Sequence, residues 1–110
     1  MEKQVLMKQF LPMTESAYYI LLSLNEPRHG YGIMQHVEEI TEGRIKIGPG
    51  TIYGTLSKLE KEELILQNQE TDRKKIYSLS EKGKKVLELE LKRLQELVKN
   101  GMKEMEVRNE

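Results

Sequence analysis

The C-terminal part of the chain carries a heptad-like apolar repeat, which restricts the fold more than any other feature of the sequence. Ser80 is a suitable N-cap for a helix of about 25 residues. Within this helix, apolar positions recur at intervals of 4, 3, 4, 3 and 4 residues, at Leu87, Leu91, Leu94, Val98, Gly101 and Met105. Such a stripe needs a facing helix to bury it. A chain of 110 residues forms only a small hydrophobic core, which is too small to bury the whole length of this helix. We therefore expect a partner subunit to cover it.

Other apolar residues enlarge this surface. Leu89, Leu97 and Met102 widen the stripe, and an apolar face at residues 5–11 predicts a short helical arm that Pro12 interrupts. We predict a twofold homodimer in which the long helix, its copy and the two arms form a bundle. The expected interface residues are Val5, Leu6, Phe10, Leu87, Leu91, Leu94, Val98, Met102 and Met105. The alternative is a long helix that folds back on its own domain, which the short loops disfavour.

Two further helices are predicted after the arm by the helical spacing of apolar residues. The first begins after Thr14, a good N-cap. The second begins after residues 29–30 and ends at Gly43, because glycine readily adopts the left-handed conformation that terminates helices. The expected inward residues are Ala17, Ile20, Leu21 and Leu24 in the first helix and Ile33, Val37 and Ile40 in the second.

A third helix and a β-hairpin complete the globular part. Residues 44–47 alternate polar and apolar and predict a very short strand, followed by a helix from Pro49 to near Glu62. Residues 64–69 and 75–79 are strand-like runs around a polar turn at 71–73. The inward residues of the third helix are Ile52, Leu56 and Leu59.

Three helices closed by a hairpin predict a winged helix-turn-helix, which is an α+β fold of mostly α content. We assign residues 1–12 to an N-terminal arm, residues 13–80 to the winged-helix domain and residues 81–110 to a C-terminal dimerisation helix.

The composition excludes several classes of function. The chain has no Cys, which excludes disulfides, thiolate metal sites and a thiol nucleophile. Neither of its 2 histidines, His29 and His36, has the companion ligands of a metal site. Because we find no phosphate-binding glycine loop, nucleophilic serine turn or paired carboxylate, we expect no enzyme and no cofactor. The lack of a signal peptide and of a membrane-spanning apolar run predicts a cytoplasmic protein.

Charge is distributed unevenly, although the formal net charge is zero. Residues 1–43 carry 3 basic and 6 acidic side chains, residues 44–85 carry 10 and 6, and residues 86–110 carry 5 and 6. The middle third therefore has a net charge of +4. A local basic surface is sufficient to meet phosphates, because electrostatic attraction in ordinary salt acts within about 8–10 Å.

Three segments of the chain resemble the PadR family of bacterial transcriptional regulators. They are His29-Gly30-Tyr31-Gly32-Ile33, the run from Pro49 to Leu56 with sequence PGTIYGTL, and the run from Lys75 to Gly83. Their order and spacing, together with one closing long helix, resemble the short subgroup of this family. Gly32 stands where family members usually have an acidic residue, and Gly54 where they often have proline. The missing side chain at Gly54 either lets the backbone approach DNA closely or only loosens the helix.

The outward side of the third helix is the candidate DNA-binding surface. Helical geometry places Gly50, Gly54, Ser57 and Lys61 outward, with Tyr53 on one flank and Thr51 and Lys58 on the other. Small residues at the start of the helix permit close approach, and its free N–H groups and dipole favour a phosphate. The family resemblance favours contact of Tyr53 and Thr51 with DNA. The alternative is that Tyr53 packs beside the hairpin and Thr51 only helps to cap the helix.

The basic turn of the hairpin is the second candidate contact. Arg73, Lys74 and Lys75 can reach phosphates or an adjacent minor groove when the preceding helix lies in the major groove. Tyr31, at the start of the second helix, can add a phosphate contact. The alternatives are a solvated loop for the basic triplet and half-buried packing for Tyr31.

A dimer of two winged helices implies a palindromic operator with half-sites about one helical turn (~34–36 Å) or a multiple apart. The family resemblance implies a repressor that is released by a phenolic or lipophilic molecule. Multidrug-binding members stack planar ligands on a tryptophan, which this chain lacks. A planar ligand would have to contact other side chains instead, namely Phe10, Leu97, Met102 and Met105. The alternative is that these residues only pack in the interface between subunits. The alternative function is a winged-helix adaptor that binds a protein partner and no specific DNA.

Overall fold

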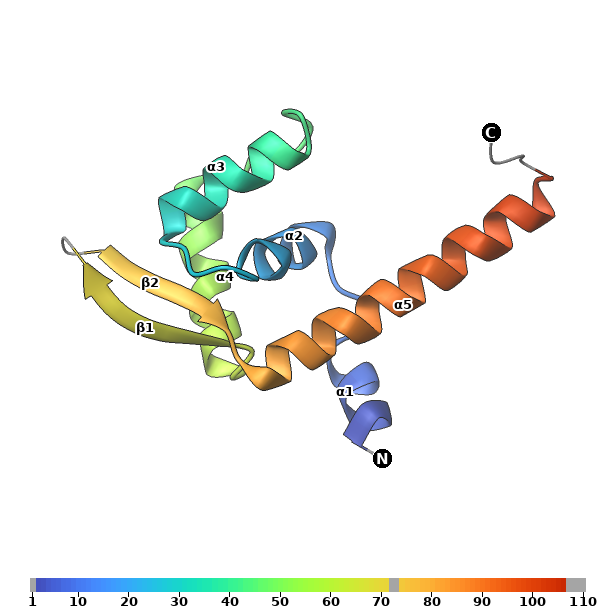
Figure 1. Cartoon of the computed structure of the whole chain (residues 1–110), viewed down its shortest axis with the longest axis horizontal. Coiled ribbons are helices and arrows are strands. Elements are labelled where there is room, and N and C mark those ends of the chain that lie inside the picture. Colours follow the sequence, from blue (N-terminus) through green and yellow to red (C-terminus); the bar gives the residue numbers. More distant parts are fainter. Residues whose placement is uncertain (1, 72–73, 107–110) are drawn as a thin grey trace.

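A computed structural model describes residues 2–71 and 74–106 of the chain (Figure 1). Its elements are, in order, α1 (Glu2–Phe10), α2 (Glu15–Ser23), α3 (Gly30–Ile40), α4 (Pro49–Lys61), β1 (Ile65–Thr71), β2 (Lys74–Leu79) and α5 (Glu81–Glu104). The predicted winged helix is confirmed, since three helices lead into an antiparallel hairpin and a long closing helix. The outer ends of strands β1 and β2 and the far end of α5 lie on opposite sides of the molecule in Figure 1.

The core lies where α2, α3 and α4 meet the root of the hairpin and the start of α5. Most residues predicted to face inward are fully buried, namely Ile20, Leu21, Leu24, Ile33, Val37, Ile52, Leu56 and Leu59. The same apolar cluster also contains Leu6, Ile47, Leu64, Ile65, Tyr77, Leu79, Val86 and Leu89. Two predictions differ from the structure: Ala17 is only partly buried, and Ile40 is exposed because α3 ends at that residue.

Side chains cap three of the described helices, namely α2, α3 and α5. The Thr14 hydroxyl oxygen accepts a hydrogen bond from Ala17 N (3.1 Å), as its role as N-cap of α2 predicts. His29 Nδ1 accepts from Gly32 N (3.0 Å) at the start of α3. Beyond the end of α3, Gly43 has a φ of 82°, so it adopts the predicted left-handed conformation.

The hairpin is attached to the start of α3 along one edge. Arg28 N donates to Tyr77 O (3.0 Å), and Tyr77 N donates to Arg28 O (2.9 Å). Within the hairpin, the pairing of β1 with β2 shifts register between Gln67 and Glu70. Such an irregularity increases the local twist of a hairpin, and Figure 1 shows the two strands curving together.

The short strand predicted at residues 44–47 is wrong, because residues 45–48 form no regular element. Arg28 already occupies the edge of β2 at Tyr77, which is where a third strand would pair. The segment is held locally instead: Ile45 N donates to Thr41 Oγ1 (3.1 Å), and Arg44 forms an exposed ion pair with Glu15 of α2.

The first turn of α5 is joined tightly to the chain that follows α4. Ser80 Oγ accepts from Gly83 N (2.9 Å) and donates to Glu63 O (2.7 Å), and Ser80 N donates to Leu64 O (3.1 Å). A Cβ atom built on Gly83 would lie 2.0 Å from Leu64 O, so only glycine permits this approach. The packing explains why a glycine stands at this position of the strand-to-helix segment.

A second attachment of α5 involves a buried carboxylate that sequence patterns did not predict. Glu90 is 1% exposed. Its Oε2 accepts from Met13 N (2.9 Å), in the segment between α1 and α2, and also from Arg93 Nη2 (3.0 Å). Its Oε1 accepts from Arg93 Nε (2.6 Å). Both oxygens are therefore used, by one donor from another part of the chain and two donors one helical turn further along α5.

Beyond Glu90, α5 extends away from the domain with an apolar face in solvent. Leu91, Leu97, Val98, Met102 and Met105 are all exposed. Leu89 lies on the opposite side and is buried in its own domain, so the prediction that it widens the stripe is wrong. In the part of the chain that the structure describes, no helix combines the length and apolar composition needed to cross a membrane.

The arm packs against the same chain. Leu6 of α1 is buried in the core cluster, and Phe10 lies at its edge with the Lys82 ammonium 5.2 Å from the ring centroid. Val5 remains exposed. Leu6 and Phe10, which were both predicted for the interface between subunits, therefore already contact their own chain.

The close approach at Gly83 makes a prediction for stability. We expect Gly83→Ala to lower the free energy of unfolding by roughly 1–3 kcal/mol, because the added methyl group clashes with the Leu64 carbonyl. Gly54→Ala is the matched control, since a Cβ at Gly54 meets nothing within 4 Å and alanine should stabilise the helix by about 0.5–1 kcal/mol. Urea unfolding of both variants measures the difference. Equal effects of the two substitutions would contradict the assigned packing.

The Glu90 contacts predict that stability depends on pH. Hydrogen bonds from Arg93, and then from Met13 N, hold the pKa of Glu90 below its ordinary value, while burial opposes them. The stabilisation is therefore complete above the ordinary carboxyl pKa and is lost as the pH falls through the lower folded-state pKa.

We expect Glu90→Gln to lower the free energy of unfolding by about 2 kcal/mol at pH 7. The difference from the parent protein should shrink as the pH falls below the ordinary glutamate pKa of about 4.3, and should vanish below the lower pKa that Glu90 has in the folded protein. Urea titrations at a series of pH values measure it, with the exposed Glu96→Gln as the control for charge. A difference that is constant from pH 7 to pH 3 would show that the carboxylate charge is not what stabilises the junction.

Candidate nucleic-acid interface

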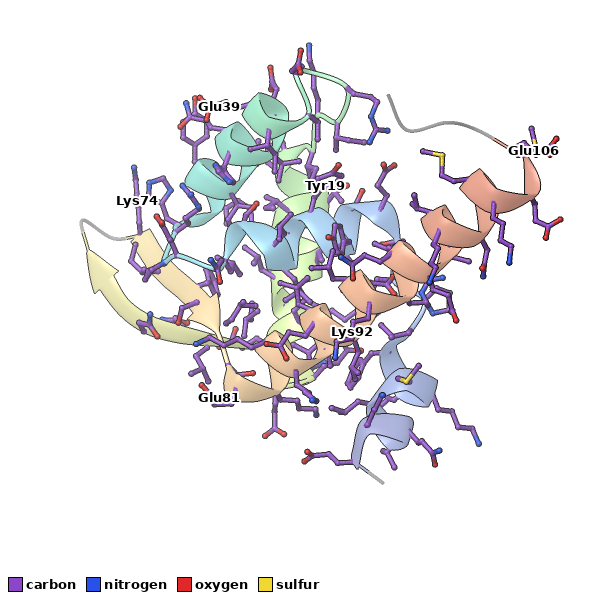
Figure 2. The ribbon with its side chains drawn as sticks, turned by 45° about the vertical axis from the view of Figure 1, so that its right-hand side comes forward. Tyr19, Glu39, Lys74, Glu81, Lys92 and Glu106 are labelled. Atoms are coloured by element: carbon purple, nitrogen blue, oxygen red, sulfur yellow. The ribbon has the colours of Figure 1, made fainter. Side chains whose placement is uncertain are left out.

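A hollow of about 400 Å³ lies between the start of α3, the outward side of α4 and strand β2. Its lining residues are His29, Gly30, Tyr31, Tyr53, Ser57, Glu60, Lys74, Lys75 and Tyr77. Five of the predicted DNA-binding residues, from three separate segments, therefore share one surface: Tyr31, Tyr53, Ser57, Lys74 and Lys75. Figure 2 shows Lys74 on the hairpin side of the molecule, far from Glu106, which follows the end of α5.

Tyr53 lies across the start of α3 because Gly30 leaves room for its ring. A Cβ atom built on Gly30 would be 2.7 Å from Tyr53 Cε1 and 2.8 Å from both Cζ and the hydroxyl oxygen. The side chain nevertheless stays 53% exposed. Tyr53 is therefore not a core residue, and its hydroxyl group is held at the rim of the hollow.

The start of α4 has unsatisfied backbone donors. Its N-cap, Gly48, has no side chain to cap it, and Thr51 makes no capping hydrogen bond. The N–H groups of Gly50 and Thr51 therefore face outward from the first turn, next to Pro49, which has no N–H. A Cβ at Gly50 or Gly54 would meet nothing within 4 Å, so neither glycine is required by packing inside the chain.

The remaining predicted residues that the structure describes do not line the hollow. Lys61 and Thr51 are exposed on α4. Lys58 is on the flank away from the hairpin, where it lines a separate hollow of about 290 Å³ together with Thr55 and Phe10. The structure therefore does not bring Lys58 together with Tyr53. Arg73 lies outside the described residues.

Sequence reasoning did not predict four of the lining residues, namely His29, Gly30, Glu60 and Tyr77. His29 lies at the hollow because it caps α3, which begins there. Tyr77 lies there because its backbone pairs with that of Arg28, just before α3. Burial raises the pKa of Tyr77, and the nearby Glu60 carboxylate adds to the effect, so the hydroxyl stays protonated. Glu60 follows Ser57 by three residues and Tyr53 by seven, which is a helical spacing that could have placed it on this face.

Charge in the hollow is therefore mixed and not uniformly basic. Lys74 and Lys75 are exposed on β2, and the Glu60 carboxylate is exposed on α4 opposite them. Among the side chains described in residues 2–71 and 74–106, no group of three or more His, Asp or Glu is placed to hold a metal ion. What the arrangement offers is hydrogen-bond donors, two ammonium groups and one carboxylate acceptor around a concave surface.

Comparison with solved structures finds the same architecture in known regulators. A PadR-like transcription factor from Bacteroides fragilis is 30% identical with a TM-score of 0.61, over 77% of this chain and 87% of that one. A PadR family transcriptional regulator from Eggerthella lenta is 22% identical with a TM-score of 0.64, over 86% of this chain and 83% of that one. The second likeness shows a shared fold.

Sequence comparison finds curated relatives that are longer proteins. The transcriptional regulator YqjI of Escherichia coli (strain K12) is 38% identical over 60 residues, which are 54% of this chain and 29% of that protein. This chain spans less than a third of the length of the curated relatives it matches first.

The model of the family described as "Transcriptional regulator PadR-like family" matches residues 20–89, which is more than half of the chain. The match runs from α2 to the buried part of α5 and includes every residue that lines the hollow. Its architecture, its motif residues and these comparisons show that the chain belongs to the PadR-like family of transcriptional regulators.

Proposed function

We propose that this protein is a sequence-specific DNA-binding regulator that inserts α4 into the major groove and contacts the adjacent backbone with its hairpin. The observation that carries the proposal is the hollow, in which Tyr53 and Ser57 of α4 share one surface with Lys74 and Lys75 of β2. Winged helices combine a groove-reading helix with backbone contacts from neighbouring elements. Fold and family are those of transcriptional regulators and not of enzymes.

The start of α4 supports close approach to DNA. Gly50 and Gly54 have no side chains, and the outward N–H groups of Gly50 and Thr51 suit a phosphate oxygen. In this proposal the Tyr53 hydroxyl donates to the DNA, while Lys61 and the hairpin amines neutralise phosphates. Arg73 and Tyr31 complete the proposed contacts.

We further propose that the regulator acts as a homodimer on a palindromic operator, as a repressor. The support is the apolar face of α5 beyond Glu90, which repeats at heptad spacing and stays exposed in the part of the chain that the structure describes. Two copies related by a twofold axis present two α4 helices to the same side of a duplex, which matches an inverted repeat.

For release from DNA we propose a lipophilic or phenolic molecule that binds between the paired helices, where Leu97 and Met102 are exposed. Phe10 contributes less to such a site, because it is already packed against its own chain. The absence of Trp means that a planar ligand contacts thioethers and aliphatic side chains. Plain packing between subunits is the competing role for these residues, and isothermal titration of the dimer with phenolic acids separates the two.

The test of the function is fluorescence anisotropy on duplex DNA from upstream of the protein's own gene, against a shuffled duplex, over a series of salt concentrations. We expect preference for the native duplex by about a thousandfold or more near physiological salt. Weak, equal and steeply salt-dependent binding to both duplexes would contradict autoregulation. Failure to select any sequence from a random duplex library would contradict specific DNA binding and favour a protein-binding adaptor.

The position of Lys74 predicts the effect of charge reversal. We expect Lys74→Glu to weaken binding to every duplex and to reduce the slope of log affinity against log salt by about 1, because one phosphate contact is lost. Lys92→Glu is the matched control, since Lys92 is an exposed lysine on α5, remote from the hollow (Figure 2). Equal salt slopes for the two variants would show that the hairpin does not contact DNA.

The contact between Gly30 and Tyr53 makes a second prediction. We expect Gly30→Ala to displace the Tyr53 ring and to reduce specific DNA affinity by about tenfold, as loss of one good contact does. Gly32→Ala is the matched control in the same helix, because a Cβ there makes only ordinary contacts at 3.5 Å with His29. Anisotropy measures the affinity, and the NMR shifts of the tyrosine ring report its position. A displaced ring with unchanged affinity would exclude Tyr53 from DNA contact.

A further inference from the structure

Helix α5 is attached to its domain at two places. The first is the Ser80 and Gly83 junction with the chain after α4. The second is the Glu90 contact with Met13 N, between α1 and α2. The two attachments are about 10 Å apart along the helix axis, because an α-helix rises 1.5 Å per residue. One attachment point would leave the helix free to tilt, whereas two fix its direction.

Glu90 lies where α5 leaves the domain. It is the last fully buried residue along the described part of the helix, and the residues after it are exposed or only partly buried. Val86 and Leu89 also pack against the domain, but apolar contacts are not directional. The hydrogen bond from Met13 N to the Glu90 carboxylate is directional and joins α5 to the segment before α2. The two hydrogen bonds from Arg93 lie within α5 and hold the carboxylate in the orientation that this bond requires.

We propose that Glu90 is a positioning residue that determines the separation of operator half-sites. The inference rests on the proposed function, namely a homodimer that pairs through α5 and binds DNA through α4. In such a dimer the paired α5 helices are the common frame. The angle at which each domain leaves that frame sets the distance between the two α4 helices, so the Glu90 contacts select the spacing between half-sites without contacting DNA.

The size of the effect follows from geometry. A rotation of about 10° moves an element roughly 20 Å from the pivot by about 3.5 Å, which is close to the rise of one base pair. A change of about 10° at Glu90 therefore alters the separation of the two α4 helices by about the rise of one base pair. The half-site sequence itself, which α4 reads, does not change.

The chemistry at Glu90 determines which substitutions are informative. A glutamine there has one acceptor oxygen, and its amide N–H₂ group faces a donor, either Met13 N or Arg93, whichever way it is turned. Glu90→Gln therefore breaks part of the contact in either orientation. Glu90→Met removes the hydrogen bonds but keeps a side chain of similar volume. Because methionine is uncharged, this variant tests the proposal without leaving a mispaired polar group at position 90.

The experiment is selection of binding sites from a random duplex library with the full chain, for the parent protein, Glu90→Gln, Glu90→Met and the exposed control Glu96→Gln. Each variant is first shown by thermal unfolding to be folded at the assay temperature. We expect the parent and Glu96→Gln to select an inverted repeat with one half-site separation, preferred over a separation changed by one base pair by about tenfold. The Glu90 variants should select the same half-site sequence at two or more separations.

The outcomes distinguish this inference from the proposed function. If the parent selects one separation and the folded Glu90 variants select the same one with equal preference, the positioning role is wrong while the function stands. If the parent selects no inverted repeat, the dimeric DNA-binding function fails and the positioning role fails with it. A change in the half-site sequence would also overturn the inference, because Glu90 would then be acting on α4 and not on spacing.

Discussion

The junction between the end of α4 and the start of α5 is the constraint on which the rest of the structure depends. Three successive carbonyl groups after α4, those of Glu62, Glu63 and Leu64, accept hydrogen bonds from Lys82 Nζ, Ser80 Oγ and Ser80 N. Gly83 allows the helix backbone to lie directly against them. The hairpin must therefore leave and return at one point, and α4 and α5 are held as one unit.

The hairpin is positioned from the other side by the backbone pair between Arg28 and Tyr77. Because this pair joins β2 to the chain just before α3, the start of α3 and the hairpin necessarily lie together. Tyr53 then completes the hollow from α4. The candidate interface is thus a consequence of two backbone junctions and one close approach at Gly30, and its shape does not rest on surface side chains alone.

Much of the fold could be predicted from the sequence, because it follows from local patterns. Apolar spacing located α2, α3, α4 and the hairpin, and capping chemistry located Thr14 and Ser80 correctly. The outward side of α4 was predicted from the same helical geometry. The predictions that fail depend on contacts between distant segments: residues 44–47 alternate like a strand, but the edge they would need is taken by Arg28. The buried contact of Glu90 could not be predicted for the same reason, since its partner Met13 lies 77 residues away in the sequence.

The uncapped start of α4 has a consequence for how stability and binding are related. Thr14, His29 and Ser80 cap α2, α3 and α5, whereas Gly48 provides no acceptor for α4. A serine or aspartate at that position would typically add only a few tenths of a kcal/mol to the stability of the free protein, because glycine is itself tolerated at an N-cap. It would also occupy the backbone N–H groups that a phosphate oxygen requires. A capping side chain and the proposed phosphate contact would therefore compete for the same hydrogen-bond donors, and glycine at position 48 leaves those donors uncapped.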